Sequence, residues 1–191
     1  SGYRTRELLA SEATPTHPGS AYGRTSVACE QLLTQAARDR FPFLLVRLPT
    51  VYGATGERPH VIRNFARKAR TGQPVTIHRF RNGIPGLDLL HIDDVRSAVV
   101  AAVTAGTTGL LHLGSSSAIS IARIAEDTGA VAPDRPARFC DVDADASTIV
   151  MDATRARAEL GWKPEVSWPE GLRQLLATLD PDPAPATPRS R

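Results

Sequence analysis

The sequence predicts an α/β fold, in which amphipathic helices alternate with short, buried parallel strands. The run 43–48 is apolar except for one arginine and is bounded by Pro42 and Pro49, a pattern typical of a strand buried in a parallel sheet. Segments with apolar residues at helical spacing lie on either side of this run, at 20–38 and 61–70. The two patterns continue to alternate toward the C-terminus, which favours an α/β fold over an all-helical or all-strand fold.

Capping and turn residues predict where the elements end. Gly72 can end the helix at 61–70, because glycine readily adopts the left-handed conformation of a C-cap. Asp93 or Asp94 can cap the next helix, and Ser120 a later one. The expected elements are a loop at 1–18, helices at 20–38, 61–70, 95–102, 121–125, 153–160 and 170–179, strands at 43–48, 75–79, 87–91, 110–113 and 139–142, and a disordered tail at 180–191.

Composition restricts the class of protein. With 41% apolar and 23% charged residues, the 191-residue chain is typical of a globular protein of one domain or slightly more. The net charge of +3 comes mostly from scattered arginines and only 5% of the residues are aromatic, so we expect no nucleic-acid partner. No segment is typical of a signal peptide or a membrane span, so we expect no membrane partner. Cys29 and Cys140 are too few for a disulfide framework or a zinc site, so we expect reduced thiols and a cytoplasmic location.

One cluster of polar residues could be taken for metal ligands. His91, Asp93 and Asp94 lie at an expected strand-to-helix junction. Packing and a helix cap require the same residue types at such a junction. We therefore assign no metal site.

Four segments of the chain match short motifs that occur together in one enzyme family. Residues 18–30 (PGSAYGRTSVACE) resemble P-x-s-x-Y-G-x-S-K-x-x-x-E, and residues 47–53 (RLPTVYG) resemble R-x-x-N-V-Y-G. Residues 87–95 (LDLLHIDDV) are similar to R-D-F-V-H-V-D-D-V, and residues 152–164 (DATRARAELGWKP) to D-x-s-K-a-r-x-E-L-G-W-x-P. In these motifs and their order the chain resembles the extended short-chain dehydrogenases/reductases, in the NAD-dependent epimerase/dehydratase group, which mostly acts on nucleotide-activated sugars.

The resemblance implies the C-terminal portion of a Rossmann-type parallel sheet plus a smaller α/β substrate-binding domain. The glycine-rich motif that holds the cofactor pyrophosphate in such folds does not occur in the sequence. We therefore expect a preceding segment to carry that motif and the first strands of the sheet. The implied division is the end of the Rossmann domain at 1–53, a substrate-binding part at 54–179 from which about 87–113 returns to the sheet, and the tail at 180–191.

The same resemblance implies that Tyr22 is the general acid/base that exchanges a proton with a sugar hydroxyl or ketone. The family places a lysine four residues later, and a cation about 4 Å from a phenol stabilises its anion by roughly 4 kcal/mol at an effective dielectric of about 20. Ser26 stands at that position and brings no charge. This departure suits reduction of a ketone better than oxidation, because a neutral phenol is already the proton donor that reduction requires. Ser1 is a candidate for the third catalytic position of the family.

The family also implies contacts with cofactor and substrate. Leu48 and Pro49 match positions whose backbone approaches the nicotinamide of NAD or NADP, and Thr50 matches a substrate-contacting asparagine; a plain strand end with a proline stop is the alternative. An arginine that often contacts the substrate diphosphate is replaced by Leu87. The arginines that could serve instead are Arg79 and Arg81, for which a solvated strand edge is the alternative interpretation.

Together these features predict an NAD(P)-dependent reductase or epimerase of nucleotide-linked sugars. The L-P-T sequence at 48–50 is most similar to 4-ketoreductases of deoxysugar pathways. The expected partners are a nucleotide-sugar substrate and a second copy of the chain, paired through the helix that carries Tyr22. The alternative is a non-catalytic or truncated relative that binds a ligand or partner without turnover, which the missing glycine motif, Ser26 and Leu87 favour.

Overall fold

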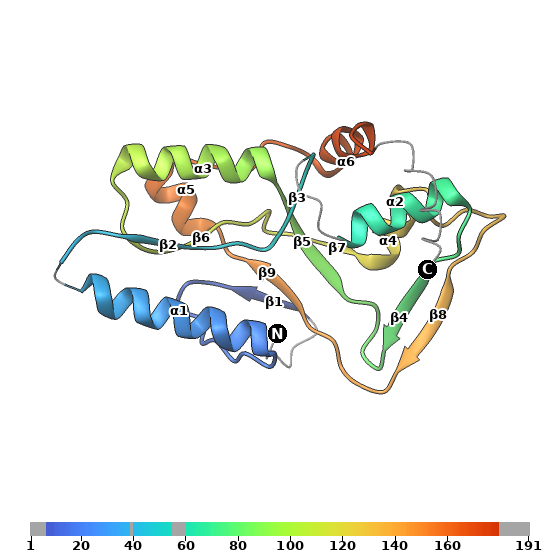
Figure 1. Cartoon of the computed structure of the whole chain (residues 1–191), viewed down its shortest axis with the longest axis horizontal. Helices are drawn as coiled ribbons and strands as arrows, with labels where there is room; N and C mark the ends of the chain where they lie inside the picture. The colour runs from blue at the N-terminus through green and yellow to red at the C-terminus, as the bar shows by residue number, and fades with distance from the viewer. Residues whose placement is uncertain (1–6, 39, 55–59, 180–191) are drawn as a thin grey trace, which may run out of the picture.

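A computed structural model describes residues 7–38, 40–54 and 60–179 (Figure 1). The helices are α1 (Ala21–Ala37), α2 (Val61–Thr71), α3 (Ile92–Ala105), α4 (Ile121–Asp127), α5 (Thr154–Leu160) and α6 (Trp168–Ala177). The strands are β1 (Glu7–Ala10), β2 (Leu44–Arg47), β3 (Thr50–Tyr52), β4 (Thr76–Phe80), β5 (Gly86–His91), β6 (Gly109–His112), β7 (Ala118–Ser120), β8 (Arg138–Val142) and β9 (Thr148–Met151). Among the described residues, no helix is long and apolar enough to cross a membrane.

Parallel strand pairs dominate the structure, which confirms the predicted α/β class. β2 lies parallel to β6, with Arg47 opposite His112, and β3 lies parallel to β5. β1 pairs with β9 and β4 with β8, both in parallel, whereas β7 runs antiparallel to β5. In Figure 1, β2 and β6 with α3 and α5 occupy one end of the long axis, and β4 and β8 with α2 and α4 the other.

Local capping explains the ends of α1 and α2. The Ser20 side chain accepts a hydrogen bond from the amide of Gly23 at 3.0 Å, so α1 begins where the sequence predicts. Gly72 ends α2 in the left-handed conformation, with φ of 68°, as expected.

The cap of α3 differs from the prediction. His91, not Asp93 or Asp94, is the N-cap, and its Nδ1 accepts from the amide of Asp93 at 3.3 Å. Asp94 is buried and bound to the distant 165–166 backbone instead. The helix begins at Ile92, before both aspartates, so they lie within its first turn and not at the cap position.

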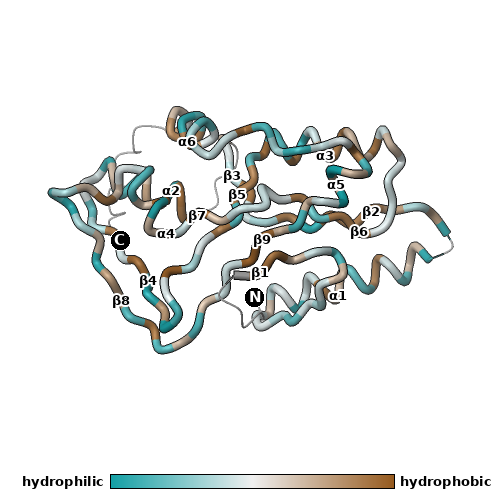
Figure 2. The backbone as a smooth tube through the Cα atoms, turned by 180° about the vertical axis from the view of Figure 1, so that it is seen from behind, coloured by the Kyte–Doolittle hydropathy of each residue, from teal (hydrophilic) through white to brown (hydrophobic). Residues whose placement is uncertain are grey.

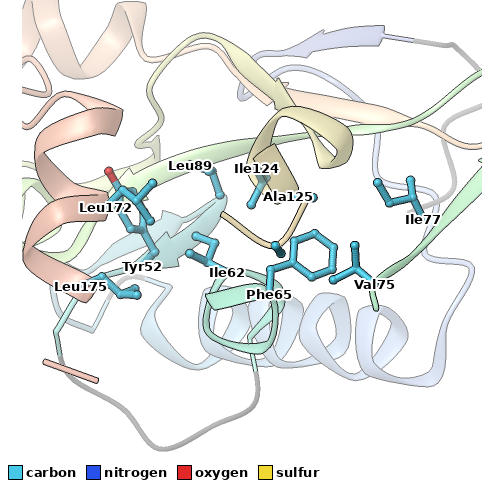
Figure 3. Close-up of a cluster of buried hydrophobic side chains, with 11 residues drawn as sticks. Tyr52, Ile62, Phe65, Val75, Ile77, Leu89, Ile124, Ala125, Leu172 and Leu175 are labelled. Atoms are coloured by element: carbon cyan, nitrogen blue, oxygen red, sulfur yellow. The ribbon is translucent and has the colours of Figure 1, made fainter. Parts of the chain in front are cut away.

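Two apolar clusters organise the interior. The cluster at the β2–β6 end contains buried side chains of β5, α3, β6 and α5, together with Trp162. The second cluster packs α2, β4, α4 and α6 around Phe65 and Ile124 (Figure 3). β3 contributes to both, since Val51 packs against the first cluster and Tyr52 lies in the second. The division of the chain into two domains at residue 53 stays a prediction.

Four short strands were not predicted. β1 forms within the segment expected to be a loop, and it pairs residue by residue with β9, which also carries no strand prediction; β3 and β7 are the other two. Figure 2 shows apolar stretches on β1 and β9 where they lie together. Segments of three or four residues are too short for a period-two pattern to stand out, and their partners lie far away in the chain. The expected tail at 180–191 lies outside the described residues.

Candidate active site

Tyr22 lies on the first turn of α1 with its phenol open to solvent. Its exposed fraction is 84%, and the phenol has no hydrogen-bond partner among the described residues. Ser26, one turn later, donates its hydroxyl to the carbonyl oxygen of Tyr22 at 3.0 Å. The hydroxyl at the family's lysine position is therefore bonded to the helix backbone rather than to the phenol.

A strong ion pair joins α1 to the end of β2. Glu30 follows Tyr22 and Ser26 at spacings of four residues, so the three side chains form one stripe along the helix. Arg47, the last residue of β2, donates to Glu30 from Nη2 at 2.6 Å and from Nε at 2.9 Å. The helix that carries Tyr22 is therefore tied to the end of β2 at Glu30, two turns from the phenol.

The predicted cofactor and substrate positions follow immediately after this end. Leu48 and Pro49 connect β2 to β3, and Leu48 is 40% exposed. Thr50 is the first residue of β3 and pairs with Leu89 of β5. These three positions therefore follow Arg47, the partner of Glu30, directly in the chain. Ser1 lies outside the described residues, and its role stays a prediction.

Arg79 and Arg81 lie elsewhere, on and just after β4. Figure 1 shows β4 and β8 at the opposite end of the molecule from β2 and β6. Arg79 binds Asp141 at 2.6 Å, and this hydrogen bond lowers the pKa of that carboxyl below its usual value. Arg81 pairs with Asp143 at 3.6 Å and with Asp145 at 3.2 Å. Both arginines are solvated at a strand edge and already carry carboxylate partners.

A cavity of about 520 Å³ between α2 and β4 escaped the sequence analysis. It is lined by His60, Val61, Asn64, Phe65, Thr76, His78, Phe80, Pro85 and Ile121. His60 also caps α2, and burial together with the charge of Arg63 lowers its pKa. One sequence pattern could have indicated this cavity: Thr76, His78 and Phe80 alternate along β4 and so share one face of the strand. The helix capped by His60 forms the facing wall.

Arg63 connects α2, which lines this cavity, to the residues that follow β3. Its Nη2 donates to the carbonyl oxygens of Gly53 and Ala54, at 3.2 and 3.0 Å. Gly53 has φ of 154°, and a Cβ there would lie 2.5 Å from Cγ2 of Ile92. The glycine of the V-Y-G segment is therefore required for close packing against α3.

Two buried carboxylates of the segment 87–95 have structural roles. Asp88 accepts from the amide and the hydroxyl of Ser115, at 2.9 and 2.7 Å, and from the amide of Met151 at 2.9 Å. Asp94 accepts from the amide of Glu165 at 2.9 Å. They join the third motif segment to Ser115 and to the residues that flank the fourth segment, and their oxygens are already bonded to protein donors.

Tyr52 is the second described tyrosine, and it lies in a different environment from Tyr22. It is buried, with its ring packed edge-on against the rings of His91 and Trp168. The ring centroids lie 5.2 and 5.4 Å from that of Tyr52. Burial, and secondarily the charge of Asp94, raise the pKa of Tyr52 to about 12. A phenol with this pKa stays protonated and is inaccessible, so Tyr52 is not the acid/base.

The sequence model of the "NAD dependent epimerase/dehydratase family" matches residues 4–114. The chain belongs to this family. It is 30% identical over 173 residues to a dTDP-L-rhamnose 4-epimerase from Burkholderia thailandensis, covering 86% of this chain and 47% of that protein. It is 27% identical to a UDP-glucuronate 4-epimerase from Thermodesulfobacterium geofontis, covering 90% of this chain and 56% of the relative. The chain thus spans about half the length of these relatives.

Solved structures of family enzymes have the same fold. A UDP-glucose 4-epimerase from Thermotoga maritima, solved with UDP-glucose, superposes with a TM-score of 0.73 at 26% identity, over 90% of this chain and 57% of that one. A dTDP-glucose 4,6-dehydratase from Bacillus anthracis, solved with NAD, gives a TM-score of 0.80 at 16% identity, over 93% of this chain and 57% of that one. The predicted family and the Rossmann-type fold class are therefore confirmed.

Proposed function

We propose that the chain forms the proton-transfer and substrate-binding part of an NAD(P)-dependent enzyme that acts on nucleotide-linked sugars, with Tyr22 as the acid/base. The observation that carries this proposal is the open phenol of Tyr22 on the helix stripe that Glu30 ties to the end of β2. A nicotinamide, when bound, supplies or accepts the hydride at a ring carbon of the sugar. Tyr22 then donates or accepts the proton at the oxygen of that carbon.

The described residues fit one end of the cofactor. The described residues offer an apolar, partly exposed strand end at Leu48 and Pro49 and, on α1, the uncovered phenol of Tyr22 as a proton donor. In the proposed complex the nicotinamide ring lies between them. The glycine-rich cradle for a pyrophosphate does not occur in the sequence. The chain therefore contributes to the nicotinamide end of an NAD or NADP site and leaves the pyrophosphate to residues outside this sequence.

The direction we propose is reduction of a keto-sugar. Phenols are normally protonated at neutral pH, so a tyrosine can donate a proton without help. Removing a proton needs a neighbouring cation or base, and Ser26 offers only a hydroxyl that is bonded to the Tyr22 carbonyl. Of the activities in this family, reduction of a keto-sugar therefore fits Tyr22 and Ser26 best.

We place the nucleoside of the substrate in the cavity between α2 and β4. Phe65 and Phe80 supply aromatic walls, and Asn64 and His78 supply polar groups for the edge of a base. The Thermotoga structure was solved with UDP-glucose, which supports a nucleotide sugar as the ligand class. Arg79 and Arg81 remain candidates for the diphosphate, and they would have to exchange their aspartate partners for it.

The alternative function is binding of a nucleotide sugar without turnover. Ser26 at the family's lysine position favours it, because its hydroxyl carries no charge and is bonded to the Tyr22 carbonyl, so it does not stabilise a phenolate. A comparison of Tyr22→Phe with Tyr52→Phe separates the two functions. Reduction of a dTDP-4-keto sugar by NADH or NADPH should fall by at least 100-fold in Tyr22→Phe and persist in Tyr52→Phe. The assay uses a longer protein in which residues outside this sequence supply the pyrophosphate cradle. Unchanged binding of UDP or dTDP, with no turnover in that protein, would support the alternative.

A homodimer through α1 also belongs to this proposal. α1 buries only Ala37 and exposes Leu32 and Leu33, at 65% and 53%. Such an apolar face, uncovered in the single chain, suits a second copy of the same helix.

The free thiols of Cys29 and Cys140, both exposed, support the cytoplasm as the compartment.

A further inference from the structure

We propose that the ion pair between Glu30 and Arg47 is the device that positions Tyr22 against the end of β2. This inference rests on the proposed role of Tyr22 as acid/base. Glu30 and Arg47 do not touch the reacting atoms in this scheme; they are positioning residues that act through the helix and the strand.

The geometry of the pair defines an orientation as well as a distance. Nε of Arg47 lies 2.9 Å from Oε1 and 3.2 Å from Oε2 of Glu30, and Nη2 lies 2.6 Å from Oε2. The planar guanidinium therefore meets the carboxylate with two nitrogens, which restricts rotation about the contact. The side chains are only 22% and 26% exposed, so solvent and salt screen this pair less than a surface pair.

The helix needs such a contact because apolar packing holds it weakly. Ala37, at the C-terminal end, is the only buried residue among the described residues of α1. Tyr22 lies at the other end, with its phenol in solvent. Within one chain, an attachment mainly at Ala37 would let the helix turn about its axis relative to β2, which would move the phenol sideways. The proposed dimer contact through Leu32 and Leu33 joins α1 to its copy and not to β2. Glu30 lies two turns from Tyr22, about 12 Å along the axis, and fixes this rotation.

The strand side of the contact is rigid. Arg47 pairs with His112 in the β2–β6 ladder, and its carbonyl oxygen accepts from the amide of Leu113 at 3.1 Å. Leu48 and Pro49 follow directly in the chain. The Arg47 side chain therefore links the helix that carries Tyr22 to Leu48 and Pro49, where we propose that the nicotinamide binds. An error of about 1 Å between reacting groups can cost 100-fold in rate, so this relation matters for turnover.

The experiment compares Glu30→Gln, Arg47→Lys and the swapped double variant Glu30→Arg/Arg47→Glu with the unmodified sequence. Each is made in the longer protein that also supplies the pyrophosphate-binding residues. Glu170→Gln is the matched control, since Glu170 forms an exposed ion pair with Arg173 on α6, at 2.6 Å. We expect kcat for keto-sugar reduction to fall about 10- to 100-fold in each single variant, with KM within twofold and the pH profile unshifted. The swapped variant should recover at least tenfold of the loss, and the control should keep the kcat of the unmodified chain.

Amide hydrogen exchange provides a readout that does not depend on turnover. Exchange along α1 should be faster in Glu30→Gln and Arg47→Lys, unchanged in Glu170→Gln, and slowed again in the swapped variant, while α3 stays unaffected. If Glu30→Gln kept the kcat of the unmodified protein, or its rate of amide exchange along α1, the inference would be overturned. A shifted pH profile would also overturn it, because it would mean that Glu30 takes part directly in proton transfer. Absence of turnover in the unmodified longer protein would contradict the proposed function, and the exchange measurement would still decide whether the pair fixes α1.

Discussion

Replacing Asp88 by asparagine should lower the free energy of unfolding by about 2 to 3 kcal/mol. The substitution keeps the shape of the side chain and removes its charge. Oδ1 of Asp88 accepts two hydrogen bonds from Ser115, and Oδ2 accepts one from the amide of Met151. An asparagine can keep its oxygen toward Ser115, but its NH2 group must then face the Met151 amide, so that two donors meet.

The magnitude follows from the bonds that change. The contact with Met151 is lost and its amide is left without an acceptor, at a cost of roughly 1 to 3 kcal/mol, and the two remaining bonds lose their charge assistance. For a chain of this size, 2 to 3 kcal/mol corresponds to a fall in Tm of about 5 to 10 °C. Urea unfolding followed by circular dichroism measures the free energy, and a thermal scan measures Tm.

Asp141→Asn is the matched control, because it makes the same chemical change at an exposed carboxylate that pairs with Arg79. It should leave the free energy of unfolding unchanged within error. If Asp88→Asn were as stable as the unmodified chain, the buried bonds of Asp88 would not stabilise the fold, and the structural role given to this motif residue would be wrong.

Three further predictions concern pH and assembly. Because the pKa of Tyr52 is raised to about 12 in the folded chain, against 10 for the unfolded chain, its contribution to stability is complete below pH 10 and is lost as the pH rises toward 12; Tyr52→Phe should remove this alkaline loss in urea unfolding at pH 9 and 11. The pKa of His60 is lowered below 6.5 by burial, so the folded chain binds fewer protons and stability falls as the pH drops below 6.5; His60→Asn, which keeps a cap for α2, should flatten the dependence between pH 5 and 7. Leu33→Glu should shift the chain from dimer to monomer in analytical ultracentrifugation, whereas the same change at the exposed Val103 of α3 should not; an unmodified chain that is monomeric at all concentrations would contradict the dimer.

The candidate site was partly predictable from sequence because its motif residues lie in short contiguous segments. Tyr22, Ser26 and Glu30 share one helix face through their spacing alone, and Leu48, Pro49 and Thr50 are neighbours in the chain. The cavity between α2 and β4 was missed, since Asn64 and His78 meet only when a helix and a strand pack together. The ion pairs of Arg79 and Arg81 were missed for the same reason: their aspartates lie on or after β8, more than sixty residues later in the chain.

The amino-acid sequence by itself determined the family, the parallel α/β class and the ends of α1 and α2, because motifs, apolar spacing and capping residues such as Ser20 and Gly72 act within a few positions. Only the tertiary structure decided that β1 pairs with β9, that Asp94 binds the 165–166 backbone instead of capping α3, and which of the two described tyrosines is open to solvent. Each of these depends on groups far apart in the chain. Their contact free energy exists only after the elements pack, so no local pattern encodes it.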